Sequence, residues 1–138
     1  MEETTVFINF ETLDLAKTYL FGGVKFLDLL LLLSVMDVLT GIIKACKLGK
    51  LRSRTAWFGY VRKMLNFVVV IVSNIIDQIM GLNGVLTYGT VLFYIANEGL
   101  SIVENLVQIG VKIPSVITDK LHVIESDSQK ESEKKAAE

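Results

Sequence analysis

Residues 64–111 read MLNFVVVIVSNIIDQIMGLNGVLTYGTVLFYIANEGLSIVENLVQIGV and contain no lysine or arginine. Half of these 48 residues are Val, Ile, Leu or Phe. The preceding residues 44–63 carry seven basic residues and no acid. Apolar runs long enough to cross a bilayer, flanked by a purely basic segment, are hard to reconcile with a water-soluble domain. The pattern predicts a small integral membrane protein.

Length and composition support this interpretation. The chain has 138 residues, 51% of them hydrophobic, and a mean hydropathy of +0.51, which is high for a soluble domain of this size. Helices that cross the membrane and a tail use nearly this whole length, so there is no room for a separate catalytic domain. Acids rather than a basic segment follow Met1, which argues against a cleavable signal peptide.

Three transmembrane helices are expected, over residues 26–43, 64–80 and 85–111. The first has 18 residues, about 27 Å of helix, which is close to the hydrocarbon thickness of about 30 Å. The sequence Gly-Leu-Asn-Gly at 81–84 predicts a short turn that returns the third helix antiparallel to the second. The basic segment 44–63 is expected to be the loop between the first two spans.

Two further segments flank the membrane domain, which covers residues 24–113. Apolar residues recur at roughly helical spacing within residues 1–23, but four acids make this segment too charged for an ordinary span. An interfacial amphipathic helix is favoured there over a partial or re-entrant pass. In the C-terminal segment 114–138, residues 115–125 are predicted to form an amphipathic surface helix, and residues 126–138 a flexible charged tail.

The basic segment also predicts the orientation. Short loops rich in Lys and Arg stay on the cytoplasmic side, so this loop and, with three spans, the C-terminus are expected to face the cytoplasm. The same residues are expected to contact lipid headgroups, which explains them more economically than nucleic-acid binding. These topology and headgroup residues are Lys44, Lys47, Lys50, Arg52, Arg54, Arg62 and Lys63.

Five acids lie within or beside the apolar segments: Asp28, Asp37, Asp77, Glu98 and Glu104. An ionised carboxylate at the bilayer centre costs about 2.5–3.5 kcal/mol and normally faces protein or water. The neighbouring sequence offers these acids little cationic compensation. Shared protons or contact with water are therefore the expected remedies.

Polar residues in the expected spans recur on single helix faces. In the third span, steps of four and three residues connect a continuous stripe from Thr90 to Gln108. Hydrogen bonding and close packing between helices is one interpretation of such stripes. The other is a surface that lines water or contacts further copies of the chain. The candidate pore or oligomer face comprises Asp37, Thr40, Gly41, Asn66, Ser73, Asp77, Tyr94, Asn97, Glu98, Ser101, Glu104, Asn105 and Gln108.

Catalytic chemistry has no support in the sequence. There is no Gly-rich phosphate loop, no metal-ligand cluster and no nucleophile with a neighbouring base. The single histidine, His122, and the single cysteine, Cys46, are interpreted as ordinary surface residues. We therefore expect no catalytic residue, no metal and no cofactor.

Several motifs resemble those of one known family, the phage-lysis and toxin-secretion holins of Gram-positive bacteria and their phages. The resemblance covers about residues 19–124, and the ordered run at 94–105 is its most specific part. The N-terminal segment and the last dozen residues show no such match. The matching stretches are Asp37-Val38-Leu39-Thr40-Gly41, Gly49-Lys50-Leu51-Arg52-Ser53, Gly59, Arg62-Lys63, Ile76-Asp77-Gln78, Asn83-Gly84, Tyr94-Ile95-Ala96-Asn97-Glu98-Gly99-Leu100-Ser101-Ile102-Val103-Glu104-Asn105, Gly110 and Lys112-Ile113-Pro114.

This resemblance implies a function. Such holins accumulate in the host cytoplasmic membrane, form homo-oligomers and open lesions that let an endolysin, or in some relatives a toxin, cross. The endolysin is a functional partner, and no stable direct binding to it is expected. Two other classes stay open from the residues alone: a small multi-pass ion channel or transporter subunit with a narrow selective pore, and a membrane scaffold without a pore.

Overall fold

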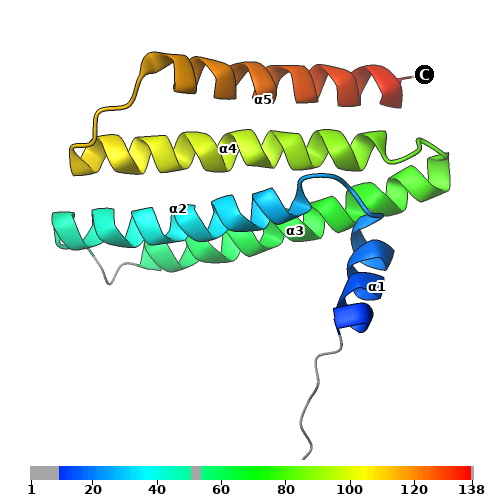
Figure 1. Cartoon of the computed structure of the whole chain (residues 1–138), viewed down its shortest axis with the longest axis horizontal. Coiled ribbons are helices and arrows are strands. Elements are labelled where there is room, and N and C mark those ends of the chain that lie inside the picture. Colours follow the sequence, from blue (N-terminus) through cyan, green and yellow to red (C-terminus); the bar gives the residue numbers. More distant parts are fainter. Residues whose placement is uncertain (1–9, 51–53, 138) are drawn as a thin grey trace, which may run out of the picture.

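The computed structural model describes residues 10–50 and 54–137, and this part of the chain is all-helical (Figure 1). The expected all-α class is therefore confirmed. The helices are α1 (Phe10–Phe21), α2 (Leu27–Leu48), α3 (Arg54–Met80), α4 (Val85–Ile109) and α5 (Ser115–Ala136).

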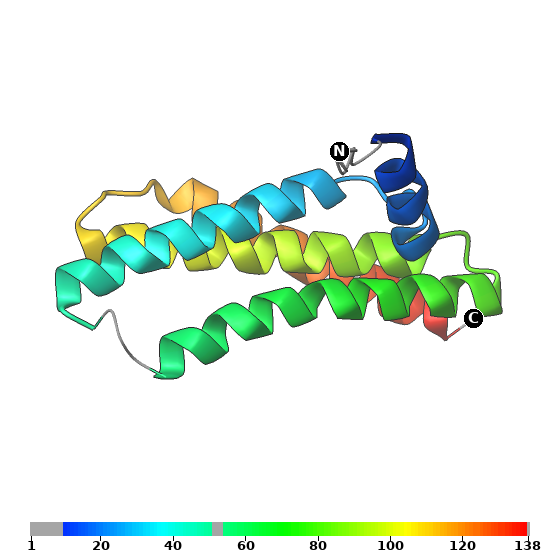
Figure 2. The same cartoon turned by 90° about the horizontal axis from the view of Figure 1, so that it is seen from below.

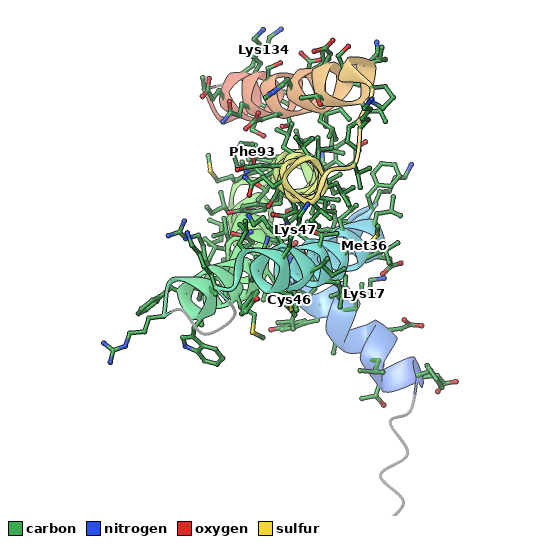
Figure 3. The ribbon with its side chains drawn as sticks, turned by 90° about the vertical axis from the view of Figure 1, so that its left-hand side faces the viewer. Lys17, Met36, Cys46, Lys47, Phe93 and Lys134 are labelled. Carbon is green, nitrogen blue, oxygen red and sulfur yellow. The ribbon has the colours of Figure 1, made fainter. Side chains whose placement is uncertain are left out.

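Helix α4 lies at the centre of the molecule. It packs against α2 and α3 on one side and against α5 on the other, so that the long helices form three layers (Figures 1 and 3). Helix α1 contacts the end of α3 and stands across the layers. Helices α2 and α3 contact each other only weakly, although both contact α4 (Figure 2). The backbones of both helices therefore lie closer to α4 than to each other.

Helices α2 and α4 each end at a glycine, which caps the C-terminus of the helix. Gly49 and Gly110 adopt φ angles of 69° and 107°, in the left-handed region that glycine enters without steric penalty. Their backbone amides bond back to carbonyls of the last helical turn, for example Gly110 N to Leu106 O at 3.2 Å. Both helices therefore end in the manner typical of a glycine C-cap.

Two segments within the described residues are long and apolar enough to cross a membrane: α2 and residues Ala56–Met80 of α3. Only 11% and 22% of their apolar windows are buried in the protein. Core helices of soluble proteins would instead be mostly buried. Large apolar side chains thus remain on the outside of these helices, as a lipid environment requires.

The helices extend further into the basic segment than the expected spans do. Helix α2 continues to Leu48 and α3 begins at Arg54, so most of residues 44–63 is helical and not a loop. Lys and Arg are good helix formers, whereas the predicted spans ended where apolar residues ended. The prediction for 81–84 is confirmed, because a turn there separates α3 from α4. Of the N-terminal segment, residues 1–9 lie outside the described residues and the remainder contains α1.

The C-terminal helix is also longer than predicted. It was expected to end near Glu125, but α5 continues to Ala136, so a flexible tail over residues 126–136 is wrong. Lys, Glu, Gln and Ala in this stretch have high helix propensity, and Lys135 pairs with Glu131 at 3.7 Å. The predicted helix depended on apolar spacing, whereas this part of α5 packs against α4 through the small side chains of Ser128 and Ser132.

Those serines contact α4 at a glycine. A Cβ atom added at Gly89 would come within 3.3 Å of the Ser128 backbone oxygen and even closer to the Ser132 hydroxyl. Near the other end of the same interface, a Cβ at Gly99 would lie 2.8 Å from Leu121. The two helices approach closely because α4 has glycine at both points.

Candidate functional site

The described part of the protein contains a buried ionic cluster that joins α2, α3 and α4. The Lys63 ammonium group of α3 donates to Asp37 Oδ2 of α2 and, at 3.0 Å, to Glu98 Oε2 of α4. The side chains of Asp37 and Glu98 are 1% and 4% exposed, and that of Lys63 is 22% exposed. Asn66 donates to the second oxygen of Glu98 at 3.5 Å. One lysine thus forms ion pairs with two carboxylates from different helices.

Hydroxyl and amide groups complete the environment of Asp37. Ser101 Oγ and Asn105 Nδ2 each donate to Asp37 Oδ1 at 2.8 Å. Asn105 Nδ2 also lies 3.1 Å from Thr40 Oγ1. Gly41 lies beside this amide, since a Cβ there would be 3.7 Å from Asn105 Nδ2. Seven of the residues predicted for the polar face therefore lie in or beside one polar network with Lys63. We call these eight residues the triad network, after its three charged members: Asp37, Thr40, Gly41, Lys63, Asn66, Glu98, Ser101 and Asn105.

The prediction that the membrane-depth acids lack cations is wrong for Asp37 and Glu98. Both pair with Lys63, one of the residues that the sequence predicts to contact lipid headgroups. Asp28 also has a cation, because Lys17 of α1 lies 2.7 Å from its carboxylate at the exposed start of α2.

A signal for Lys63 was present in the sequence. The expected polar face of α3 contained Asn66, Ser73 and Asp77, and Lys63 continues it by one three-residue step. The expected span begins at Met64, so Lys63 lies one residue outside it and was not counted in the polar face of α3. A long lysine can lie along a helix and carry its ammonium group inward, so the first basic residue of a span is not always a headgroup residue.

A second polar site joins α3 to the start of α4. Asp77 accepts hydrogen bonds from the backbone amides of Leu86 at 3.1 Å and Thr87 at 2.8 Å, and from the Thr87 hydroxyl. The first amides of a helix lack intrahelical partners and lie at the positive end of its dipole. Asp77 therefore caps α4 from a neighbouring helix. Further along, Ser73 and Thr90 share a hydrogen bond of 3.0 Å.

Two other polar side chains satisfy helix C-termini. Asn74 donates to the carbonyls of Tyr19 at 3.3 Å and Leu20 at 3.0 Å, at the end of α1. The Lys47 ammonium group lies between α2 and α4 and donates to the carbonyl of Ile109 (Figure 3). Asn74 is not among the residues predicted for the polar face, and Lys47 is predicted to contact headgroups. Such a hydrogen bond to the C-terminal carbonyls of another helix cannot be predicted from sequence spacing, because it depends on where that helix ends.

The stripe predicted along α4 divides between two environments. Thr90 and Ser101 hydrogen-bond to α3 and α2, and Tyr94 packs against the apolar cluster of Leu27, Leu30, Val70 and Val91. Glu104 and Gln108 are exposed and bond to each other at 3.2 Å. Asn97 is half-buried, and its side chain makes no hydrogen bond with the described residues. We call Asn97, Glu104 and Gln108 the outward polar set.

The remaining basic residues fall into two groups. Lys44 and Lys50 line a cavity of about 280 Å³ between α2 and α3, whereas Arg54 and Arg62 are exposed. Arg52 lies outside the described residues. No cluster of three potential metal-ligating side chains occurs among residues 10–50 and 54–137.

Comparison with known proteins identifies the family. The model of the bacteriophage holin family matches residues 16–126. The chain belongs to this family. The resemblance found in the sequence is therefore confirmed, and as a member of a family of membrane pore-forming proteins the protein is not an enzyme.

Individual relatives agree with the family match. A protein named probable holin, from Bacillus phage phi105, is 69% identical over 94% of this chain and 96% of its own length. The protein YqxH of Bacillus subtilis is 74% identical over 94% of this chain and 92% of its own. A 14.9 kDa protein from Clostridium perfringens is 38% identical over 75% of this chain and 80% of its own. No solved structure matches the chain.

Proposed function

We propose that this holin self-associates in the bacterial cytoplasmic membrane and opens lesions through which an endolysin, or a toxin, reaches the outside. No stable complex between the holin and its cargo is required, because an opening large enough for a folded protein needs no specific contact. Family membership and the phage relative named probable holin support the proposal.

One observation carries the proposal for self-association. Asn97 lies at the middle of the 25-residue α4, and its amide has no hydrogen-bond partner among the described residues. Glu104, two turns further, is exposed and bonded only to an exposed glutamine. Unpaired polar groups are unfavourable in hydrocarbon. A second copy or water is needed to satisfy them, and a ring of copies supplies both.

We also propose that α4 is the third span. Its 25 residues correspond to about 37 Å, enough to cross the hydrocarbon with a tilt. The turn before it returns the chain toward the side of the basic residues. Those residues favour the cytoplasm, so the end of α4 and the C-terminus would lie there as well.

This topology requires α5 to leave the side of α4. The second half of α5 carries six charged residues between 127 and 135. Each charge at the bilayer centre would cost about 2.5–3.5 kcal/mol. In the membrane α5 therefore lies on the cytoplasmic surface. The α4 face that it vacates contains Gly89 and Gly99, and small residues of this kind allow close helix approach between copies.

The single cysteine, Cys46, can be labelled to test the proposed orientation in the membrane without introducing another cysteine. Cys46 is exposed at the end of α2, and we expect a membrane-impermeant maleimide to label it in inverted vesicles but not in intact cells sampled before any lesion has opened. The matched control is Cys46→Ser with Lys25→Cys, at an exposed position before α2, which should show the opposite pattern. Labelling of Cys46 in intact cells before lesions open would contradict the proposed topology.

Vesicles containing markers of graded size test the proposed lesion. Purified holin should release a small dye, a large dextran and an active endolysin in the same concentration range. Release of ions without dextran would instead indicate a narrow selective channel. Retention of every marker, together with no growth arrest on overexpression, would indicate a scaffold.

A further inference from the structure

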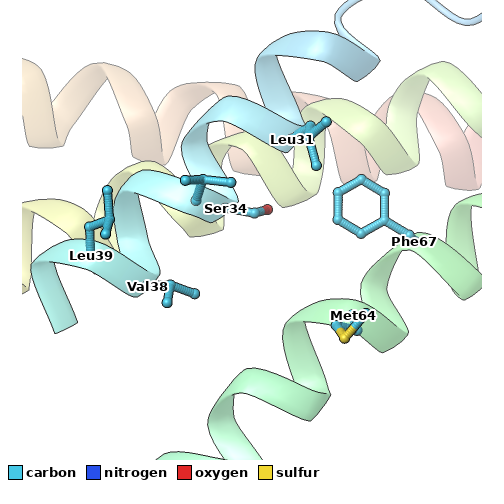
Figure 4. Close-up of a pocket in the computed structure, with 7 residues that line it drawn as sticks. Leu31, Ser34, Val38, Leu39, Met64 and Phe67 are labelled. Atoms are coloured by element: carbon cyan, nitrogen blue, oxygen red, sulfur yellow. The ribbon is translucent and has the colours of Figure 1, made fainter. Parts of the chain in front are cut away.

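The two helices that flank α4 leave a slot between them. Helices α2 and α3 contact each other only weakly, and a cavity of about 420 Å³ opens between their middle portions. Leu31, Ser34 and Phe67 point into it, with Val38 and Met64 on its walls (Figure 4). The lining is almost entirely apolar, and Ser34 supplies the only side-chain hydroxyl among these residues.

A second, basic cavity follows along the same pair of helices. It has about 280 Å³ and lies toward the basic end of α2 and α3, lined by Lys44, Lys50, Tyr60 and Lys63 among others. The two cavities are lined by residues that are adjacent in sequence on both helices, Val38 and Met64 for the apolar cavity and Asp37 and Lys63 for the basic one. Lys44 and Lys50 form no ion pair with the described residues. Two uncompensated ammonium groups thus stand at one end of an apolar slot.

The dimensions of the slot match one leaflet of a bilayer. Lys44 and Leu31 are 13 residues apart on α2, which is about 20 Å along the helix. Half of a hydrocarbon core of about 30 Å is about 15 Å. A helix from a second copy is too wide for the apolar part, because three turns of helix about 10 Å across and 16 Å long occupy about 1,300 Å³. A single hydrocarbon chain is much narrower than a helix.

We propose that the slot between α2 and α3 binds one anionic phospholipid, with its phosphate on Lys44 and Lys50 and an acyl chain between Leu31 and Phe67. Anionic headgroups attract clustered lysines at the cytoplasmic leaflet, and the acyl chain fills apolar space that the helices leave open. The inference rests on the membrane placement given under Proposed function, but not on the lytic activity.

Gly59 gives direct access to the basic cavity. A Cβ atom added there would meet no protein atom within 4 Å, although Gly59 is part of the lining. A leucine at this position can therefore occupy the headgroup site without displacing the triad network. Val38→Trp fills the apolar cavity in the same way, and Lys44→Ala with Lys50→Ala removes the cations.

The test is retention of lipid by holin from vesicles with equal amounts of phosphatidylglycerol and phosphatidylcholine, followed by native mass spectrometry. The unaltered protein should keep one phosphatidylglycerol per chain, in at least tenfold preference over phosphatidylcholine. Gly59→Leu, Val38→Trp and the double lysine variant should each lower that retention at least tenfold. Matched controls are Val68→Trp on the exposed side of α3 and Lys130→Ala with Lys134→Ala at exposed positions of α5, and these should retain it.

Three results would overturn the inference: no preferential lipid, equal loss in the controls, or crosslinks that place a second copy in the slot. Flotation with vesicles is measured for every variant, so failure to insert is recognised as failure of the proposed membrane placement. Lysis is scored separately. Loss of lesions with lipid still bound would remove the proposed function and leave the lipid site standing.

Discussion

Lys63→Met is expected to lower the free energy of unfolding by about 3–5 kcal/mol, the usual effect of removing one partner from a buried ion pair. The substitution shortens the side chain by only one heavy atom but leaves Asp37 and Glu98 facing the same space without a cation. Both carboxylates are almost completely buried. Methionine satisfies neither, so the network loses its charge balance while its packing volume stays similar.

Reversible unfolding in mixed detergent micelles, followed by circular dichroism, measures this loss. The triple variant Lys63→Met, Asp37→Asn and Glu98→Gln should recover most of it, because no buried charge then remains. Arg62→Met is the matched control: Arg62 is adjacent in sequence and exposed, so the change should stay within about 0.5 kcal/mol. Equal stability of Lys63→Met and the control would show that the triad network does not hold the helices together.

The helical organisation was largely predictable from the sequence. The apolar runs, the turn at 81–84 and the polar faces follow from composition and from the three- and four-residue spacing of polar positions. The family was also recognisable, since the resemblance over about residues 19–124 corresponds to the match over 16–126. These features depend on one segment at a time, or on a short ordered motif.

Features that join two helices were not predictable in the same way. Asp77 was singled out on its own helix face, but its use as a cap for α4 depends on the placement of Leu86 and Thr87. Likewise, the serines of α5 had no apolar periodicity, and their fit against Gly89 appears only when both helices are placed. Tertiary contacts decide these roles.

Tertiary contacts also explain why the polar stripe of α4 has both hydrogen-bonded and exposed members. All its members share one face in sequence, yet α2 and α3 cover only part of that face. Ser101 and Asn105 reach Asp37, whereas Asn97 and Glu104 fall beyond the covered part. The outward polar set thus makes no hydrogen bond to α2 or α3, and in the proposed function it is the part of the stripe available for contacts between copies.

Asn97→Leu combined with Glu104→Leu is expected to reduce release of large markers from vesicles at least tenfold and to prevent lysis in cells that contain an endolysin. Leucine is more favourable than an amide or a carboxylate in hydrocarbon, so insertion should be retained or improved. Neither side chain hydrogen-bonds to α2 or α3 in the described structure. The core of the monomer should therefore keep its stability, and only contacts with other copies or water are lost.

The control for this variant is Gln78→Leu, a polar-to-leucine change at an exposed position on α3, which should leave lysis timing unchanged. Flotation with vesicles and unfolding in micelles verify that both variants insert and fold. Normal release by the Asn97 and Glu104 double variant would remove the outward polar set from the mechanism. Because the triad network is internal and the outward set is not, the two sets of substitutions separate folding from lesion formation: Lys63→Met should lower monomer stability first, whereas the double leucine variant should yield a stable, inserted and inactive protein.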